Sequence, residues 1–424
     1  MNVIGIGLKA LKEIIDNKTS YHIVLERMKS QYNLNEDDKK RLYSIVLGSM
    51  RHFTYLQYEA TSLYTEFQKD DDEIYLLIIS LFEIRYKNKI IAPFLTIEDA
   101  CATSEYLQLR FDINQLQENL NTLSKSKTLL PDTLFKDPYK YNSLFFSTPE
   151  WLIKMWAKQY GDETCMNILL SNQRHQTIFL AVNTLKVSRD EIVEAEYYNP
   201  VDACDTAVIY SSHFNFSEQV EASLGKLYVQ DLSLQVMLDQ IEYFYGMHAL
   251  HLNGITGSLS SNVAIRLASE EGKIETVLTN EVRYRRCKYQ YSRLDLKNAN
   301  AIFSKLSLVK TYCIYNDYDL VFVTPPSSYL GQIRRRPDIL VTIDKKDIKD
   351  IVIKQKEMLN EAKDYVRIGG QLVYSVQTIN LDETKEVVED FIRNNDNYEL
   401  VTSRQIFPFE FNSDGLYYAI LRKN

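Results

Sequence analysis

Apolar residues recur every three or four positions along the first 140 residues, a spacing that predicts one amphipathic helix after another. Leu8, Leu11 and Ile15 form the first apolar stripe, and a second stripe lies within residues 42–46. A third apolar run at 74–82 follows four acidic residues, whose charge stabilises the first turn of a helix. No run in this region alternates as a strand would. We therefore predict an all-α domain over residues 1–140.

The pattern changes at residues 126–144, where prolines and polar residues replace the apolar stripes, as is typical of a linker. A helix is expected from about residue 150, with a Ser or Thr cap before it and Pro149 in its first turn. An apolar run at 177–183 predicts a strand. We therefore expect a small α+β subdomain over residues 141–225.

From residue 226 onward, apolar runs of strand length alternate with helical stripes, an order that indicates a parallel α/β sheet. A helix over 349–366 is expected to stop at Gly369 and Gly370. The fold class predicted is therefore multidomain, with a Rossmann-like α/β domain over residues 226–424. Strands are expected at 248–252, 275–278, 311–315, 319–323, 371–376 and 416–421.

The length of 424 residues supports two or three domains, because a single hydrophobic core rarely grows that large. No apolar run approaches the roughly 20 residues that a bilayer needs, and the N-terminus shows no export signal, so a cytoplasmic location is expected. The five cysteines lack paired spacing, which argues against disulfides and a metal site. A net charge of -8 restricts any RNA-binding surface to a local patch of cations.

The most distinctive stretch runs from a buried strand at 318–323 into Thr324-Pro-Pro-Ser327-Ser and ends in Arg-Arg-Arg-Pro-Asp-Ile. It resembles the Sun/Fmu/RsmB family of 16S ribosomal RNA cytosine-C5 methyltransferases, in which Asp-Ala-Pro-Cys-Ser stands between the same strand and Arg-Arg-x-Pro-Asp-Ile. The resemblance covers essentially the whole chain, since 34–51 is similar to NusB-like domains and 413–419 to the family's ending. It implies a NusB-like RNA-binding domain, a small substrate-binding subdomain and an S-adenosylmethionine-dependent methyltransferase domain.

The same resemblance assigns the cofactor positions. Asp231 lies in a Val-Gln-Asp-x-Ser segment of the family, although it could equally serve only as a helix cap. The family's glycine-rich turn corresponds to 251–260, where Gly254 and Gly257 are kept and His251, a satisfied strand-end histidine in our interpretation, replaces an Asp. Leu278 holds the place of the acid that binds the cofactor ribose, and leucine cannot accept a hydrogen bond. S-adenosylmethionine is thus the cofactor that the family implies, but these losses argue against its binding.

The catalytic positions that the resemblance assigns are also changed. The family's chemistry requires a thiolate that adds to carbon 6 of cytosine. The two cysteine positions hold Gln377 and Ser327, and the acid position holds Thr324. A serine would need an adjacent base to act as a nucleophile. We therefore predict no catalytic residue for this mechanism.

Cations that could contact RNA remain, because guanidinium groups bind phosphates and tyrosine rings stack on bases. The cluster at 283–291, which interleaves cations with tyrosines, could equally be a solvated helix face. The predicted RNA-binding residues are Arg334, Arg335 and Arg336 of the arginine turn, Asn172 and Arg174 of an Asn-Gln-Arg segment, and Arg283 and Arg285.

Three functions stay open on the sequence. The leading hypothesis is a degenerate member of the family that binds RNA, most plainly ribosomal RNA, without methyl transfer. The first alternative is an active methyltransferase with a rearranged cofactor turn. The second is a protein-interaction scaffold without a role in RNA binding.

Overall fold

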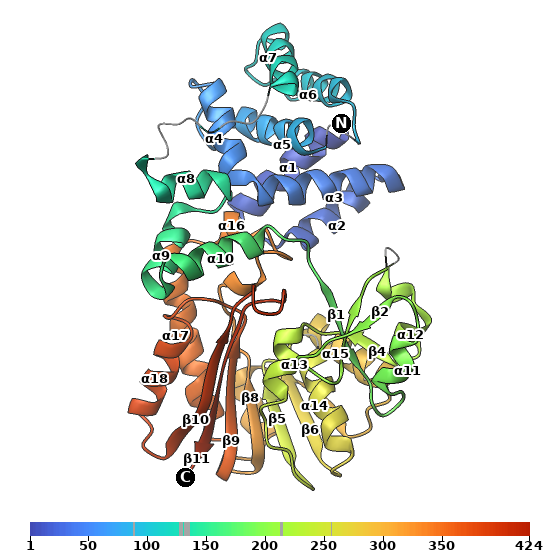
Figure 1. Cartoon of the computed structure of the whole chain (residues 1–424), viewed down its shortest axis with the longest axis vertical. Coiled ribbons are helices and arrows are strands. Elements are labelled where there is room, and N and C mark those ends of the chain that lie inside the picture. The colour runs from blue at the N-terminus through green and yellow to red at the C-terminus, as the bar shows by residue number, and fades with distance from the viewer. Residues whose placement is uncertain (88–89, 127–129, 131–135, 213–214, 256) are drawn as a thin grey trace. The chain divides into compact units, whose positions relative to one another are not determined.

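The structure is a computed structural model that describes residues 1–87, 90–126, 130, 136–212, 215–255 and 257–424. The chain forms two compact units (Figure 1). The first unit consists of Met1–Gln173 and Arg335–Asp344, and the second of Arg174–Arg334 and Lys345–Asn424. No helix in these described ranges is long and apolar enough to cross a membrane.

The described part of the first unit contains helices and loops but no strand, as the apolar stripes predict. Its centre is α5, whose residues from Glu73 to Ile84 are all buried and which contacts α1, α3, α4 and α6. The fully buried Glu83 accepts bonds of 2.8 and 2.7 Å from Arg41, and pairing of this kind offsets the cost of burying a charge. The helices are α1 (Val3–Asp16), α2 (Tyr21–Gln31), α3 (Glu36–Arg51), α4 (Phe53–Leu63), α5 (Asp72–Tyr86), α6 (Pro93–Leu107), α7 (Ile113–Lys125), α8 (Pro138–Phe145), α9 (Glu150–Tyr160) and α10 (Asp162–Asn172).

The segment Arg335–Asp344 returns to the helical unit far along the sequence. Its short helix α16 (Ile339–Thr342) contacts α1 and α3. The hydroxyl of Tyr21 donates to the carbonyl of Arg335 at 3.4 Å, and Lys18 pairs with Asp344 at 3.0 Å. Two of the three arginines of the predicted arginine turn, Arg335 and Arg336, are thus part of this unit.

The second unit contains a small antiparallel sheet in the order β2-β3-β1-β4. Its central strand is β1 (Ile178–Val182), which pairs with β3 (Ala207–Tyr210) on one side and β4 (Leu227–Val229) on the other. The edge strand β2 (Tyr198–Pro200) follows α11 (Arg189–Val193). This arrangement confirms the strand predicted at 177–183.

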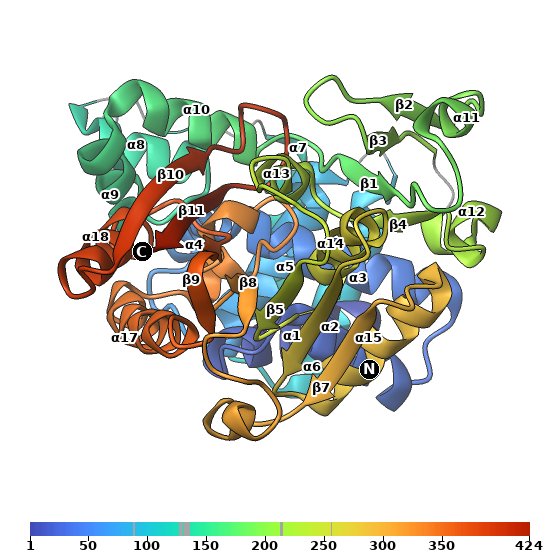
Figure 2. The same ribbon diagram turned by 90° about the horizontal axis from the view of Figure 1, so that it is seen from below.

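The larger sheet of the second unit has seven strands in the order β10-β11-β9-β8-β5-β6-β7. The strands from β9 to β7 in this order are parallel, whereas β11 is antiparallel to both of its neighbours. Figure 2 shows the sheet between two layers of helices. The strands are β5 (His248–Leu252), β6 (Lys273–Leu278), β7 (Ala299–Phe303), β8 (Tyr318–Val323), β9 (Val366–Val376), β10 (Tyr398–Ile406) and β11 (Leu416–Lys423).

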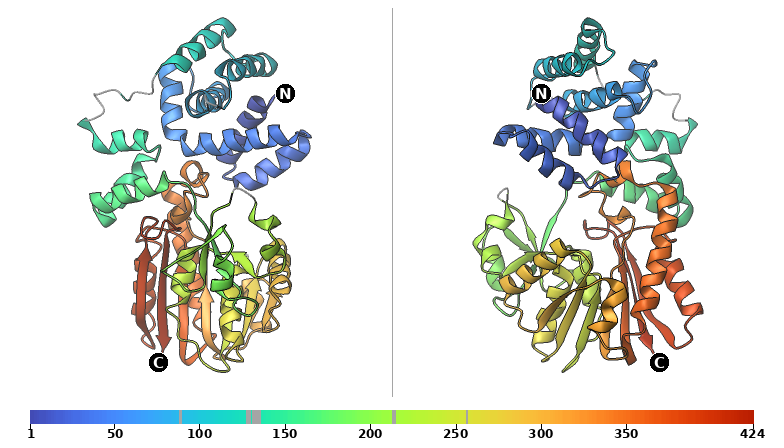
Figure 3. Two further views of the ribbon diagram at one scale, coloured as in Figure 1. Left: turned by 45° about the vertical axis from the view of Figure 1, so that its right-hand side comes forward. Right: turned by 180° about the vertical axis from the view of Figure 1, so that it is seen from behind.

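Both faces of this sheet are covered, and the side chains of its central strands alternate between two cores. In β8, Leu320 and Phe322 pack in the core beneath one helix layer, whereas Val321 and Val323 pack in the core beneath the other. The views of Figure 3 show the same two layers from further sides. The first layer is α13 (Leu232–Leu238), α14 (Ser258–Ala268) and α15 (Glu281–Leu294), and the second is α17 (Lys345–Ala362) and α18 (Lys385–Arg393).

Several predicted elements are wrong. Residues 311–315 end the 3₁₀ helix Leu306–Thr311 and then form a turn, because Tyr312 and Ile314 are exposed and only Cys313 is buried. The helix expected over 349–366 ends at Ala362, and the glycines expected to stop it lie within β9.

The region before α9 also differs from its prediction. Pro149 is the residue before the first turn of α9, and this helix has no side-chain cap. The last part of the predicted linker at 126–144 forms α8, whereas residues 127–129 and 131–135 lie outside the described residues.

Candidate functional site

The carboxyl ends of β5 and β8 mark the place where the strand order of the larger sheet reverses. The chain proceeds from β5 to β6 and β7 on one side and then continues with β8 and β9 on the other. Ligands of α/β sheets bind in the crevice at such a switch point. The loops that follow β5, β8 and β9 therefore form the candidate site, and hydrogen bonds join them.

A network of four neutral side chains closes this edge of the sheet. His251 at the end of β5 lies 2.7 Å from Ser260 through its Nδ1 and 2.9 Å from Thr324 through its Nε2. Thr324 also donates to the carbonyl of Asn253 at 3.1 Å, and Asn253 donates back to the carbonyl of Thr324 at 3.0 Å. All four side chains are buried.

These contacts select one protonation state of His251. Because the hydroxyl proton of Thr324 is directed at Asn253, the tautomer with a proton on Nε2 satisfies every partner, with Ser260 donating to Nδ1. Burial lowers the pKa of His251 to about 3. The ring is therefore neutral at pH 7, as expected of a satisfied strand-end histidine.

The two glycines of the cofactor-type turn are required by packing within the protein. A Cβ atom on Gly254 would lie 2.5 Å from Cγ2 of Thr276 in β6. Gly257 has a φ of 80°, and a Cβ atom there would lie 2.9 Å from Sγ of Cys287 in α15. A side chain at either position would therefore overlap a neighbouring element of the fold.

Leu278, at the position of the ribose-binding acid, is fully buried at the end of β6. Its side chain belongs to the core beneath α13, α14 and α15, and it lies 3.6 Å from the Cβ position of Gly254. An apolar side chain here offers nothing to a ribose hydroxyl, which would lose its hydrogen bonds to water at about 1–3 kcal/mol each.

Asp231 fixes the fold in two ways. Its Oδ1 accepts from the backbone and hydroxyl of Ser233, which caps α13. Both carboxylate oxygens also accept from the backbone nitrogen of Asp414, at 3.2 and 3.1 Å. The carboxylate is therefore occupied by partners from β4–α13 and from the loop before β11.

The two positions of the family's cysteines have no base beside them. Oγ of Ser327 accepts from the backbone of Tyr329 at 3.3 Å, and within the described ranges no acid or histidine bonds to it. Gln377 follows β9, half-buried, and its carbonyl accepts from the backbone of Gly331 at 3.2 Å. Neither geometry provides an activated nucleophile.

A buried carboxylate, which the sequence did not reveal, joins these two loops. Glu383 accepts from the backbone of Ser328 at 2.8 Å, from Gln355 at 3.0 Å and from Thr378 at 3.2 Å. The hydroxyl of Ser328 and the amide of Asn380 also donate to it. Burial raises the pKa of Glu383, while the hydrogen bonds act in the opposite direction. The glutamate ties the loop after β8 to the loop after β9 and to α17.

Its polar surroundings are the signal that could have indicated Glu383. Thr378, Asn380 and Thr384 form a polar run between a strand and a helix, where a buried acid can collect several donors. Periodicity alone does not distinguish this residue from the exposed acids nearby.

The arginine turn is largely committed to the protein itself. Arg334 is only 5% exposed, and its guanidinium donates to Asn412 and to the carbonyl of Ser413. Arg336 pairs with the buried Asp338 at 3.3 Å. Arg335 is half-buried. Partners within the protein therefore hold Arg334 and Arg336.

The remaining predicted RNA-binding residues differ in exposure. Asn172, at the end of α10, is buried, and its Nδ2 has no partner in the part of the chain that the structure describes. Arg174 is exposed. In α15, Arg283 is half-buried and Arg285 is exposed, with a pairing to Glu281 at 2.5 Å. The exposed face of α15 thus presents cations to solvent.

Comparison with known protein families identifies two regions of the chain. Residues 256–422 match the family described as 16S rRNA methyltransferase RsmB/F. Residues 148–196 match the ferredoxin-like domain of RsmF/B-like methyltransferases.

Relatives of similar length and solved structures with a similar fold accompany these matches. Ribosomal RNA small subunit methyltransferase B of Photorhabdus laumondii is 25% identical over all of this chain and 99% of its own length. The probable ribosomal RNA small subunit methyltransferase B of Bacillus subtilis is 24% identical over all of this chain and 99% of its own length. The crystal structure of PH0851 has a TM-score of 0.79 at 18% identity, with 100% of this chain and 99% of that chain covered. NSun6 from Pyrococcus horikoshii, solved with SFG, has a TM-score of 0.58 at 17% identity, with 65% of this chain and 98% of that chain covered.

Replacement of Glu383 by alanine is expected to destabilise the second unit by about 3 kcal/mol, because several buried donors lose their acceptor. Urea unfolding followed by circular dichroism measures this change in the free energy of unfolding. The matched control is Glu386→Ala, which removes an exposed glutamate of α18. Equal stability of the two variants would contradict the linking role of Glu383.

The stability of the wild-type protein is expected to fall as the pH drops below about 6.5, partly because unfolding lets His251 take a proton that the folded state refuses. His251→Gln is expected to remove up to about 1.4 kcal/mol per pH unit from this slope between pH 6 and 4. Urea unfolding at a series of pH values measures the slope. His175→Gln, at an exposed histidine, is the control, and an unchanged slope in His251→Gln would refute the neutral network.

Proposed function

Because the chain belongs to the family of 16S rRNA methyltransferases RsmB/F, we propose that it is an RNA-binding member that no longer transfers a methyl group. Its proposed partner is ribosomal RNA, in keeping with the names of its relatives. We further propose the family's domain plan for it, with a NusB-like domain over 1–140, a substrate-binding subdomain over 141–225 and a methyltransferase-type domain over 226–424.

The observation that carries this proposal is the neutral network at the switch point. The positions at which the resemblance places two aspartates hold His251 and Thr324, and these two bond directly to each other at 2.9 Å. Ser260 and Asn253 satisfy their remaining groups. The side chains therefore form a closed set that needs no charged ligand and no proton transfer.

The residues present do not fit S-adenosylmethionine as the family binds it. Leu278 cannot accept from the ribose, Gly254 and Gly257 are packed against Thr276 and Cys287, and the carboxylate of Asp231 is occupied by backbone and hydroxyl donors. Loss of both ribose hydrogen bonds alone costs about 2–6 kcal/mol of affinity. The site as it stands is therefore not arranged for methyl transfer from this cofactor.

RNA binding by the second unit is proposed for the exposed face of α15 and for Arg174. Arg285, Lys288 and Tyr289 are exposed on this helix, and the ammonium of Lys288 lies 5.6 Å from the ring centroid of Tyr284. Such a face offers cations to phosphates and rings to unpaired bases. Arg334 and Arg336 would instead act by shaping the loop that they hold.

Isothermal titration calorimetry with S-adenosylmethionine tests the loss of cofactor binding. We expect no saturable heat up to about 1 mM cofactor, a concentration that corresponds to a binding free energy of about −4 kcal/mol. The B. subtilis relative serves as the comparison protein in the same buffer. A dissociation constant in the micromolar range would contradict the proposal and favour an active enzyme with a rearranged site.

A further inference from the structure

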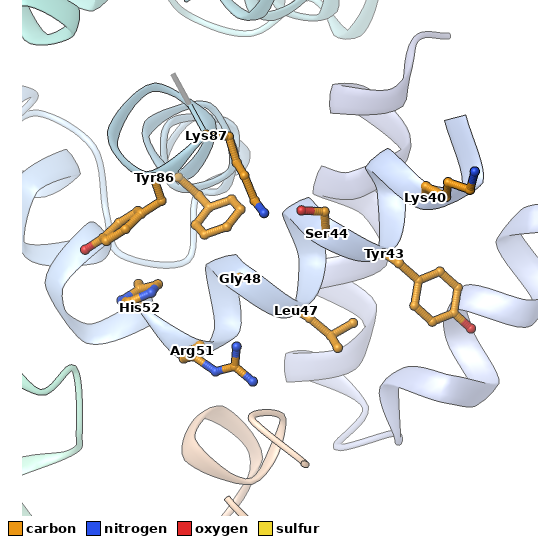
Figure 4. A pocket seen from close by; sticks show the side chains of 10 residues that line it. Lys40, Tyr43, Ser44, Leu47, Gly48, Arg51, His52, Tyr86 and Lys87 are labelled. Atoms are coloured by element: carbon orange, nitrogen blue, oxygen red, sulfur yellow. The ribbon is translucent and has the colours of Figure 1, made fainter. Parts of the chain in front are cut away.

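The helical unit has an open groove between α3 and α5, with a volume of about 560 Å³ (Figure 4). Its lining comes from α3 between Lys40 and Arg51, from His52 just after it, and from the end of α5, so it lies within one unit. Cationic and aromatic side chains dominate it, and none of its lining residues is acidic. The lining residues are Lys40, Tyr43, Ser44, Leu47, Gly48, Arg51, His52, Phe82, Tyr86 and Lys87.

One wall of the groove is a stack of rings. His52 stacks on Tyr86 with centroids 4.0 Å apart and an angle of 13° between the planes, and Phe82 lies 5.5 Å from Tyr86 on the same stack. Tyr86 is 42% exposed. Burial, together with the charge of Arg51, lowers the pKa of His52 to about 4, so the stack carries no charge of its own at neutral pH.

Gly48 makes this wall possible. A Cβ atom at this position would lie 1.9 Å from Cζ of Phe82, so the ring packs directly on the backbone of α3. Alanine would be a better helix former than glycine at this position. The close packing of the Phe82 ring on the backbone therefore explains why glycine occupies this position.

Two cations lie beside the stack, and a third lies at the other end of the groove. Figure 4 shows Lys87 reaching from the end of α5 toward Ser44 and Gly48 of α3, with Arg51 on the turn beyond. Lys40 lies nearer the N-terminus of α3, and its ammonium is 4.0 Å from Asp37. The side chain of Lys40 is 79% exposed and that of Asp37 is 97% exposed. An ion pair so exposed contributes little and is readily exchanged for another anion.

We propose that this groove binds a short unpaired segment of RNA, with phosphates at Lys40, Arg51 and Lys87 and a base stacked on Tyr86. Neutral rings beside separate cations match the alternation of bases and phosphates along a single strand. The inference rests on the proposed function, since it names a second RNA-contacting surface, located in the helical unit. An acidic segment of a protein would match the cations but would leave the ring stack without a partner.

Fluorescence anisotropy on the full-length protein tests this site, with a labelled, unstructured RNA of about ten A and U nucleotides as the probe. The double variant K40A/K87A is expected to bind about tenfold more weakly at 0.15 M salt, and the slope of log K against log salt should fall by about 1.4. Tyr86→Leu is expected to weaken binding at least about fivefold through the lost stacking.

The matched control is K9A/K69A, which removes two exposed lysines of the same unit that do not line the groove. Thermal unfolding verifies that each variant is folded. If the wild-type protein binds RNA and K40A/K87A binds as tightly as K9A/K69A, the groove is not the site. If the wild-type protein binds no RNA, the proposed function itself fails. If polyglutamate displaces the probe as well as unlabelled RNA does, the groove binds acidic protein segments instead.

Discussion

The hydrogen bonds among His251, Ser260, Thr324 and Asn253 close the carboxyl edge of the larger sheet. The arrangement of the loops at this edge depends on them. These side chains are buried, so each polar group that loses its partner costs about 1–3 kcal/mol. A network of this kind is stable only when every member is satisfied. It therefore constrains all of its members together.

This coupling links two of the altered positions, His251 and Thr324, which bond directly to each other. A carboxylate at position 324 would face the carbonyl of Asn253, to which the threonine hydroxyl now donates. Burial of an unpaired charge beside a neutral histidine is costly. Glu383, by contrast, has a full set of donors and holds the loops after β8 and β9 in place without reference to a ligand. The fold of the site is maintained by interactions that do not require its chemistry.

The sequence predicted the elements whose apolar pattern is strong. The five residues of β5 were predicted at their observed bounds, and the helical character of the N-terminal region was predicted from its stripes. The strand expected at 311–315 was wrong, because exposed aromatic residues imitate the alternation of a buried strand. The helix that was expected to stop at Gly369 ends earlier, at Ala362. Gly369 and Gly370 did not mark its end, because glycines also occur within strands.

The candidate site was predictable only as far as local sequence determines it. Asp231 follows the rule for helix caps, so the alternative reading of this residue was available from the sequence. The burial of Arg334 against Ser413 depends on residues 79 positions apart, which no local pattern reports. Glu383 was missed for the same reason, since its partners come from three separate segments, namely the loop after β8, α17 and the loop after β9.

The arginines of the arginine turn belong to two different units of the chain. Arg334 belongs to the α/β unit, whereas Arg335 and Arg336 belong to the helical unit together with α16. A stretch that resembles a cationic RNA-binding turn in the sequence is thus a segment that passes between two units. Exposed cations elsewhere, on α15 and in the groove beside α3, are better placed to meet phosphates.

The most consequential proposal for this protein is that it transfers no methyl group to RNA. Transfer of tritium from labelled S-adenosylmethionine to small-subunit ribosomal RNA tests it most directly, with the B. subtilis relative assayed in parallel. We expect the RNA to carry no more label with the protein than without it. Labelling that depends on the protein, and that is abolished by Ser327→Ala or Gln377→Ala, would instead show that the protein is an active methyltransferase.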